Sequence, residues 1–441
     1  MTASLLHAGI ETPSEVRSSK LRHGIKEYLS YPRQFSRNAR LFLLGSFLLG
    51  VNFEMFQLLL NLYLKEMGLG EGNIGLINSS RAVGLTLMAI PAAWLISRLQ
   101  LKWLLIGSSV IFAAFAVGLT TSASFAAMVS FSVLMGMAFT FSRVAAGPFF
   151  MRNSTVKERT HLFSFSFGVL LLAGMIGSQL GGRLVSIMTS LAGDTPLGYR
   201  YTLLVGVAIG LLSLIPFAMI KSSAPSADEN RINLTRETLR ARGKFYFRVT
   251  FANFLMGLGA GLIIPFLNLY FKTKFNLSPA TIGSFYFCTV LTMFVGTILA
   301  PYFARTFGLV RTIAVTQLVS IPFMLLLAYT TSIYVAFTAY VLRAGLMNIG
   351  VPITTNVGME LSEKNEQGLV NALLMIAWNG SWMLSTAIGG RLIETHGYTI
   401  TFLATSGLYV LSTLFYYWSF HKSERKEELT GHWSLVKTEE A

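Results

Sequence analysis

Two near-identical stretches 207 residues apart, Asn61-Leu62-Tyr63-Leu64-Lys65 and Asn268-Leu269-Tyr270-Phe271-Lys272, indicate how the chain is built. Each stretch ends a long apolar run. Two further matches recur at a spacing of 208 residues: Ile74-Gly75 with Ile282-Gly283, and Gly181-Gly182-Arg183-Leu184 with Gly389-Gly390-Arg391-Leu392. Three matched places at almost one spacing indicate a duplicated chain.

Twelve apolar runs surround these motifs, and each can cross a bilayer as an α-helix, which takes about 20 residues. The runs are 41–64, 74–97, 103–121, 125–149, 162–187, 199–220, 246–271, 279–303, 310–329, 333–356, 369–393 and 398–420. With 53% hydrophobic and 12% charged residues, the composition excludes a soluble globular or disordered chain. We expect an all-α membrane protein with twelve transmembrane helices in two pseudo-symmetric six-helix halves.

The net charge is +15, and most of the basic residues lie in the tails and in the loops between the apolar runs. Of 35 Lys and Arg, 26 fall in the tails and the loops of one side, six on the other side and three inside runs. The positive-inside rule then places both termini in the cytoplasm. No aromatic residues interleave with the basic ones, so nucleic acid is not an expected partner. The expected parts are a cytoplasmic tail (1–40), two halves (41–220 and 245–420), a basic cytoplasmic linker (221–244) and a second cytoplasmic tail (421–441).

Motifs for chemistry are missing from the sequence. The single cysteine, Cys288, excludes an intramolecular disulfide and a cysteine-based metal site. There is no His-Glu-x-x-His, no Gly-x-Ser-x-Gly and no Gly-x-x-x-x-Gly-Lys. We therefore expect no enzyme, no cofactor, no metal and no ATP-driven pump.

Two motifs carry a resemblance to a known family. Arg143 is followed by Gly147, and Gly177-Ser178-Gln179-Leu180-Gly181-Gly182 is similar to Gly-Pro-x-x-Gly-Gly with Ser178 in place of proline. With the duplicated layout, residues 41–420 resemble the major facilitator superfamily, and the motifs resemble most its drug:proton antiporter branch. The resemblance implies a central cavity, alternating access and an association of Arg143 with proton coupling.

Four ionisable residues lie inside runs, where each costs at least about 2.5 kcal/mol unless it faces a cavity or a partner. They are Glu54, Arg81, Arg143 and Arg343. Glu54 is the only deep carboxylate, so we expect it to carry a coupling proton, with Arg143 and Arg81 modulating its charge as their distances change. The alternative is a static Glu54–Arg ion pair that fixes helix packing.

Arg343 has no acidic residue at comparable depth in its own half, so we expect it to bind an acidic group of the substrate. The alternative is a pair with Glu54 across the cavity. Polar and aromatic residues on the expected cavity-lining helices are further substrate-binding candidates, although interhelical bonds or core packing explain such residues equally well. They are Asn52, Gln57, Asn253, Asn268, Asn348, Trp378, Asn379 and Trp382.

Small residues recur at equivalent places in the two halves. Gly177-x-x-x-Gly181 and Ser385-x-x-x-Gly389 have the spacing that lets helix backbones approach closely, and Gly182 and Gly390 follow directly. We expect these six residues to pack helices that rock against each other. Packing of lipid-facing helices is the alternative use.

The sequence favours a secondary active transporter of a small organic solute, with proton-coupled efflux of amphipathic metabolites or drugs as the leading interpretation. Proton-coupled uptake of a sugar or organic anion, and lysolipid movement, remain open. A nontransporting membrane receptor or a membrane-embedded enzyme is the alternative of another class. The expected setting is a monomer in the cell membrane, in contact with lipids, protons and a small-molecule substrate.

Overall fold

The computed structural model describes residues 35–221, 236–360 and 367–430, and every regular element in these ranges is helical. The expected tails and linker therefore lie largely outside the described residues. The first half contains α2 (Arg37–Glu66), α3 (Glu71–Arg98), α4 (Leu101–Thr121), α5 (Phe125–Asn153), α6 (Val156–Ala192), α7 (Thr195–Leu211) and α8 (Leu214–Met219). The second half contains α9 (Arg236–Ile263), η1 (Ile264–Phe266), α10 (Leu267–Phe275), α11 (Pro279–Phe307), α12 (Leu309–Tyr329), α13 (Ile333–Glu360) and α14 (Gln367–Thr430).

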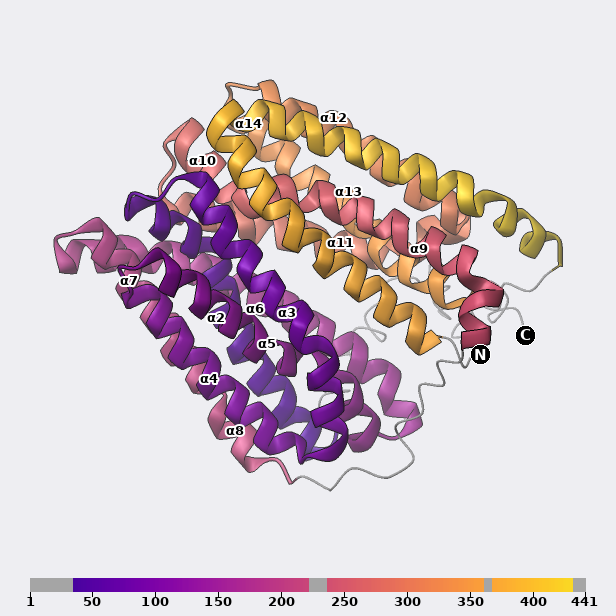
Figure 1. Ribbon diagram of the computed structural model, residues 1–441, viewed down its shortest axis with the longest axis horizontal. Helices are drawn as coiled ribbons and strands as arrows, with labels where there is room; N and C mark the ends of the chain where they lie inside the picture. Colours follow the sequence, from indigo (N-terminus) through magenta and orange to yellow (C-terminus); the bar gives the residue numbers. More distant parts are fainter. Residues whose placement is uncertain (1–34, 222–235, 361–366, 431–441) are drawn as a thin grey trace, which may run out of the picture.

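Eleven helical stretches of the described chain are long and apolar enough to cross a membrane. The last, residues 372–421, spans 50 residues and contains a sharp turn at Gly397, whose φ of 79° favours glycine. Figure 1 shows the yellow ribbon of α14 turning back there, so α14 has two legs. The expected all-α fold with two helical halves is confirmed.

Proline divides two of the expected runs. The run 199–220 breaks between α7 and α8, where Pro216 cannot bond to the carbonyl of Leu212. The run 246–271 becomes α9, the short η1 helix that contains Pro265, and α10. Other prolines, such as Pro148, lie within continuous helices.

The repeated asparagines lie where the two halves meet. The Asn61 amide donates to the Pro265 carbonyl at 2.5 Å, and the Asn268 amide donates to the Leu58 carbonyl at 2.7 Å. Asn78 adds a bond to the side-chain oxygen of Asn61 at 2.7 Å. Each half therefore satisfies a backbone carbonyl of the other, so the duplicated motif holds the halves together.

The repeated tyrosines act within each half. The Tyr63 hydroxyl donates to the Thr120 carbonyl at 2.7 Å, and the Tyr270 hydroxyl donates to the Leu327 carbonyl at 2.5 Å. Both acceptors lie near the end of the third helix of their half, and both tyrosines are fully buried. The duplication thus preserves a local contact as well as the one between the halves.

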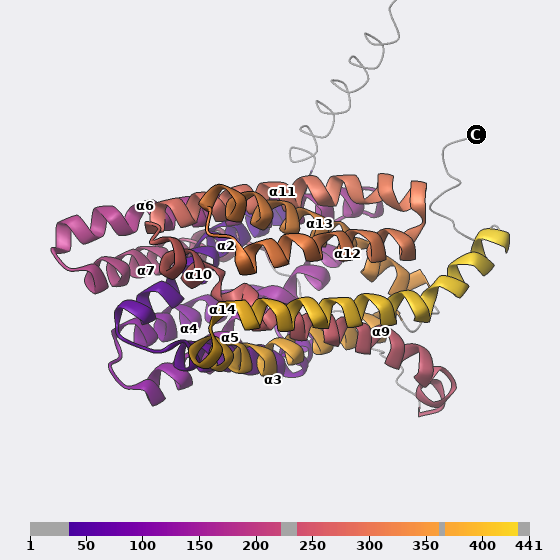
Figure 2. The same ribbon diagram turned by 90° about the horizontal axis from the view of Figure 1, so that it is seen from above.

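Glycine pairs complete the contact between the halves. A Cβ on Gly75 of α3 would lie 3.1 Å from the Cα of Gly390 in α14, and one on Gly182 of α6 would lie 3.2 Å from the Cα of Gly283 in α11. These backbones approach too closely for larger side chains. Figure 1 shows the halves together at this end and diverging towards the other. Figure 2, seen from above, shows α3 beside α14 and α6 beside α11.

The remaining small residues pack helices within one half. A Cβ on Gly177 would lie 2.7 Å from the Val51 carbonyl, and one on Gly181 would lie 3.3 Å from Met55. Gly389 and Ser385 contact α9 in the same way, and Ser385 is 1% exposed. Of the six expected packing residues, four therefore lie inside a half, whereas Gly182 and Gly390 lie between halves.

We expect Gly182→Ala to lower thermal stability. The added Cβ would lie 2.5 Å from the Pro279 carbonyl, so α6 and α11 must separate, which costs about 1–3 kcal/mol. The matched control is Gly107→Ala in α4, where nothing lies within 4 Å and alanine favours the helix. Thermal unfolding of the purified protein should show a lower midpoint for Gly182→Ala alone. Equal midpoints would contradict the close contact.

Candidate functional site

Two of the intramembrane arginines share one aromatic ring. The guanidinium of Arg81 on α3 lies 5.8 Å from the centre of the Phe53 ring, and that of Arg143 on α5 lies 6.0 Å from it. Phe139 stacks on Phe53 at 4.4 Å and also contacts Arg143, at 5.6 Å. The negative ring faces stabilise both cations deep in the bundle.

Glu54 follows Phe53 on α2 and interacts electrostatically with both arginines. Within the described residues, however, no arginine nitrogen lies within 4.0 Å of its carboxylate; the ion pairs found there are Lys65–Glu71 and Lys272–Glu66. Arg81 instead donates to the Gln57 side chain. The three charges therefore form an electrostatic group without a direct ion pair.

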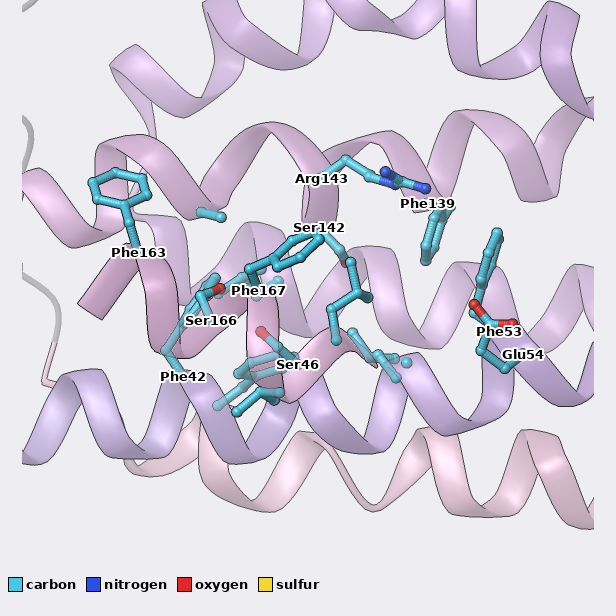
Figure 3. A pocket seen from close by; sticks show the side chains of 17 residues that line it. Phe42, Ser46, Phe53, Glu54, Phe139, Ser142, Arg143, Phe163, Ser166 and Phe167 are labelled. Atoms are coloured by element: carbon cyan, nitrogen blue, oxygen red, sulfur yellow. The ribbon is translucent and has the colours of Figure 1, made fainter. Parts of the chain in front are cut away.

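A cavity of about 340 Å³ in the first half reaches this group of charges. Glu54 and Arg143 both line it, and the Arg143 side chain is exposed although it lies in the interior of the bundle. Figure 3 shows Arg143, Phe139, Phe53 and Glu54 together towards one end of the cavity. A solute in this cavity can therefore reach both a carboxyl group and a guanidinium group.

The carboxyl of Glu54 also lies beside the other half. A Cβ on Gly174 of α6 would lie 3.6 Å from the Glu54 carboxyl carbon and 3.6 Å from Val290 of α11. Tyr286 and Tyr340, both in the second half, interact electrostatically with Glu54. The carboxyl therefore lies where relative movement of the halves would change its surroundings.

Arg343 on α13 lies in the second half and is 6% exposed. The hydroxyls of Tyr340 and Tyr409 lie near its guanidinium. Its Nε has no hydrogen-bond partner within the described part of the chain. A buried guanidinium N–H without an acceptor is costly, so this atom can bind an incoming acceptor.

The other substrate-binding candidates lie in different places. Asn52 is 1% exposed and packs against Gly210 of α7, and Asn268 lies in the contact between the halves. Asn348 donates to the Ala344 carbonyl of its own helix at 3.1 Å. Gln57 accepts from Arg81. The structure thus brings Gln57, but not Asn52 or Asn268, to the charged group.

The candidates on α14 lie on its first leg. The rings of Trp378 and Trp382 are 6.0 Å apart and tilted by 39°, and Asn379 beside them is half-buried. The Trp382 indole nitrogen has no partner in the described ranges. Asn253 on α9 donates to the Leu374 carbonyl at 2.9 Å, so it joins α9 to this leg.

Sequence reasoning missed the aromatic members of the site. Phe53 and Phe139 hold the guanidinium groups, and Tyr340 and Tyr409 surround Arg343. The position of Phe53 next to Glu54 was an available signal. Phenylalanine is so common in the apolar runs that no single ring stands out. No cluster of three or more His, Cys, Asp or Glu side chains that could hold a metal occurs among the described residues.

Known families and structures match this architecture. The family model of the Major Facilitator Superfamily matches residues 42–248 and again 249–438. No curated protein matches the chain. A bacterial homologue of the human lysosomal transporter Spinster, in an inward-facing and unoccupied conformation, has a TM-score of 0.73 at 15% identity, with 90% of this chain and 98% of that chain covered.

Two further solved structures are similar. The human organic anion transporter MFSD10 (TETRAN) has a TM-score of 0.60 at 20% identity and covers 86% of this chain and 99% of its own. A D-xylose-proton symporter has a TM-score of 0.68 at 15% identity, with 86% of this chain and 96% of that chain covered. At such identities these likenesses show the fold alone. The two family matches span both helical halves, and the chain belongs to the Major Facilitator Superfamily.

Proposed function

We propose that the protein is a proton-coupled secondary transporter of a small amphipathic organic solute that carries an acidic group. The observation that supports this most is the charge of the ionisable groups inside the described bundle: Arg81, Arg143 and Arg343 against the carboxylate of Glu54. An excess of cations inside the bundle favours an anion because it offsets the cost of removing these charges from water. As a monomer in the cell membrane, the protein would bind solute between its halves and release it by alternating access.

Glu54 provides the coupling in this proposal. Its carboxylate and a solute anion would both be attracted to the guanidinium groups of Arg143 and Arg81. Protonation of Glu54 removes its competing charge and so favours the anion, and by linkage a bound anion favours the proton. Cooperative binding of both in one conformation drives movement in the same direction. This supports proton-coupled anion uptake, which the sequence left open.

Exchange of a solute for protons is the second candidate function. The Arg143–Gly147 spacing, which resembles the antiporter branch, is the observation that favours it. In exchange, proton and solute compete, so a cationic or neutral drug displaced by protonation of Glu54 would leave as protons enter. The two candidates therefore predict opposite directions of solute movement in a proton gradient: an anion enters with protons in the first, and a cationic or neutral drug leaves as protons enter in the second.

The Glu54→Gln variant should lose coupling to protons. In proteoliposomes with an acidic exterior, the wild type should take up radiolabelled benzoate faster than protein-free liposomes do, whereas the variant should lose this gradient-dependent rate, because its amide takes up no proton. The assay is benzoate uptake with and without the imposed gradient, corrected for uptake by liposomes without protein.

Asp194→Asn is the matched control, because Asp194 caps α7 through the Leu197 amide in the loop before that helix, and asparagine caps equally well. It should keep wild-type coupling. Unchanged gradient dependence in Glu54→Gln would remove Glu54 from the mechanism. Benzoate binding without any flux would instead favour a receptor.

The charge excess predicts selectivity for anions. Benzoate should raise the thermal unfolding midpoint of the wild-type protein, whereas benzamide, which has the same ring but no charge, should raise it little or not at all. In Arg143→Gln the benzoate shift should fall, corresponding to an affinity loss of tenfold or more, since a charge-assisted hydrogen bond contributes about 1.5–3 kcal/mol. Equal shifts for both ligands would contradict the proposed solute class.

A further inference from the structure

The cavity of the first half extends well beyond the charges that the proposed coupling uses. Its lining residues on α2 run from Phe42 to Glu54. At 1.5 Å per residue this is roughly 18 Å along the helix. A cavity of about 340 Å³ that is lined over this length is elongated along α2, and we call it the slot. Figure 3 shows the lining side chains spread along the helix axis in this way.

The end of the slot near the beginning of α2 is apolar. Phe42 and Phe217 are about 1% exposed, with their ring centres 6.2 Å apart. Phe163 and Phe167 of α6 also line the cavity and are 44% and 43% exposed. Phe163 and Phe167 offer an apolar surface without a charge, backed by the buried Phe42 and Phe217, and such a surface binds a hydrocarbon tail.

Hydroxyl groups lie in the middle of the slot. Ser46, Ser142 and Ser166 line it from α2, α5 and α6. In Figure 3, Ser166 lies beside Phe42, and Ser46 and Ser142 lie nearer to Glu54. None makes a hydrogen bond to another described residue. Several other helical serines bond to their own backbone, as Ser109 does to the Leu105 carbonyl at 2.8 Å. The three hydroxyls can therefore bond to a ligand.

The far end of the slot is charged. The Arg143 guanidinium points towards Phe139 in Figure 3, and Glu54 lies beyond it. A planar guanidinium there suits a carboxylate or a phosphate. Glu54 opposes an anion only while it is ionised. The slot therefore presents three chemistries in order: apolar rings, hydroxyls and a cation.

We propose that this slot binds a single-tailed amphipathic anion, with its acidic group at Arg143, a hydrogen-bonding linker at the serines and its tail among the phenylalanines at Phe42. This inference rests on the proposed function, because the acidic group would be the one coupled to Glu54. It adds that the apolar part of the solute is bound by the first half alone. A fatty-acylated small acid has this chemistry.

The test uses the full-length protein in lipid nanodiscs and three matched probes. N-lauroylglycine has an acid, an amide and a tail; N-lauroylglycinamide lacks the charge, and N-acetylglycine lacks the tail. We expect N-lauroylglycine to bind at least tenfold more tightly than either of the others, after subtraction of binding to empty nanodiscs. Equal affinity of the two lauroyl probes, or of the two acids, overturns the proposal.

A variant locates the site. Ser166→Phe should narrow the slot and weaken N-lauroylglycine binding at least tenfold. Leu172→Phe adds the same ring on the same helix at a position that is 48% exposed and outside the cavity lining, and it should bind as the wild type does. Equal losses in both variants, or no loss in Ser166→Phe, contradict the assignment.

Photolabelling locates the tail in the wild-type protein without any substitution. N-lauroylglycine with a diazirine at its terminal carbon should label the peptides that contain Phe42 and Phe217. Labels confined to outward-facing positions such as Leu172 overturn the inference. Benzoate tests the proposed function separately. If the wild-type protein couples benzoate to protons but does not prefer N-lauroylglycine, the proposed function stands and the assignment of the slot is wrong.

Discussion

Three guanidinium groups and one carboxylate lie in the interior of the described bundle, where the other buried polar side chains are uncharged, and the proposed function depends on how these charges are compensated. Two of the cations, Arg81 and Arg143, contact the ring of Phe53, and Arg81 also donates to Gln57. Neither is within ion-pair distance of Glu54 in the described chain. Such a group is stabilised enough to fold yet keeps a net positive charge for an anion. A close ion pair would satisfy the charges permanently and leave less reason to bind a solute.

The duplicated halves share a scaffold but not this chemistry. Applying the repeat spacing, Gly261 corresponds to Glu54, Thr289 to Arg81 and Val351 to Arg143. The asparagines that join the halves and the tyrosines that bond within each half are repeated, whereas the charges are not. The first half thus holds the proposed proton site, and the second contributes Arg343. In the proposed cycle, relative movement of the two halves changes the surroundings of Glu54. Proton coupling then requires no second titrating group in the other half.

Much of the fold could be predicted from the sequence, because membrane helices are fixed by length and apolarity. The run expected at 125–149 lies within α5, and the repeat spacing indicated the two halves. The break before Leu267 was harder to predict, because proline interrupts some membrane helices and not others: Pro265 ends α9, but Pro148 lies inside α5. Neighbouring helices decide between these outcomes.

The site was predictable only in part. A charge in an apolar run is conspicuous, so Glu54, Arg81 and Arg143 could be singled out, and the structure brings them into one electrostatic group. An asparagine in an apolar run is less informative, since its amide can join two helices as readily as it can bind a substrate. Asn268 illustrates this: its side chain bonds to backbone at the contact between halves rather than facing the cavity. The slot could not be predicted from the sequence because its lining residues come from five helices, α2, α4, α5, α6 and α8.

The central claim is that a proton and an anion bind together, and proton uptake measures this most directly. Weakly buffered wild-type protein, mixed with benzoate at constant temperature near neutral pH, should take up protons from solution, up to about one per anion bound, as read from a pH indicator. Release of protons on anion binding, or binding with no proton exchange at any pH between 5 and 8, would contradict the account.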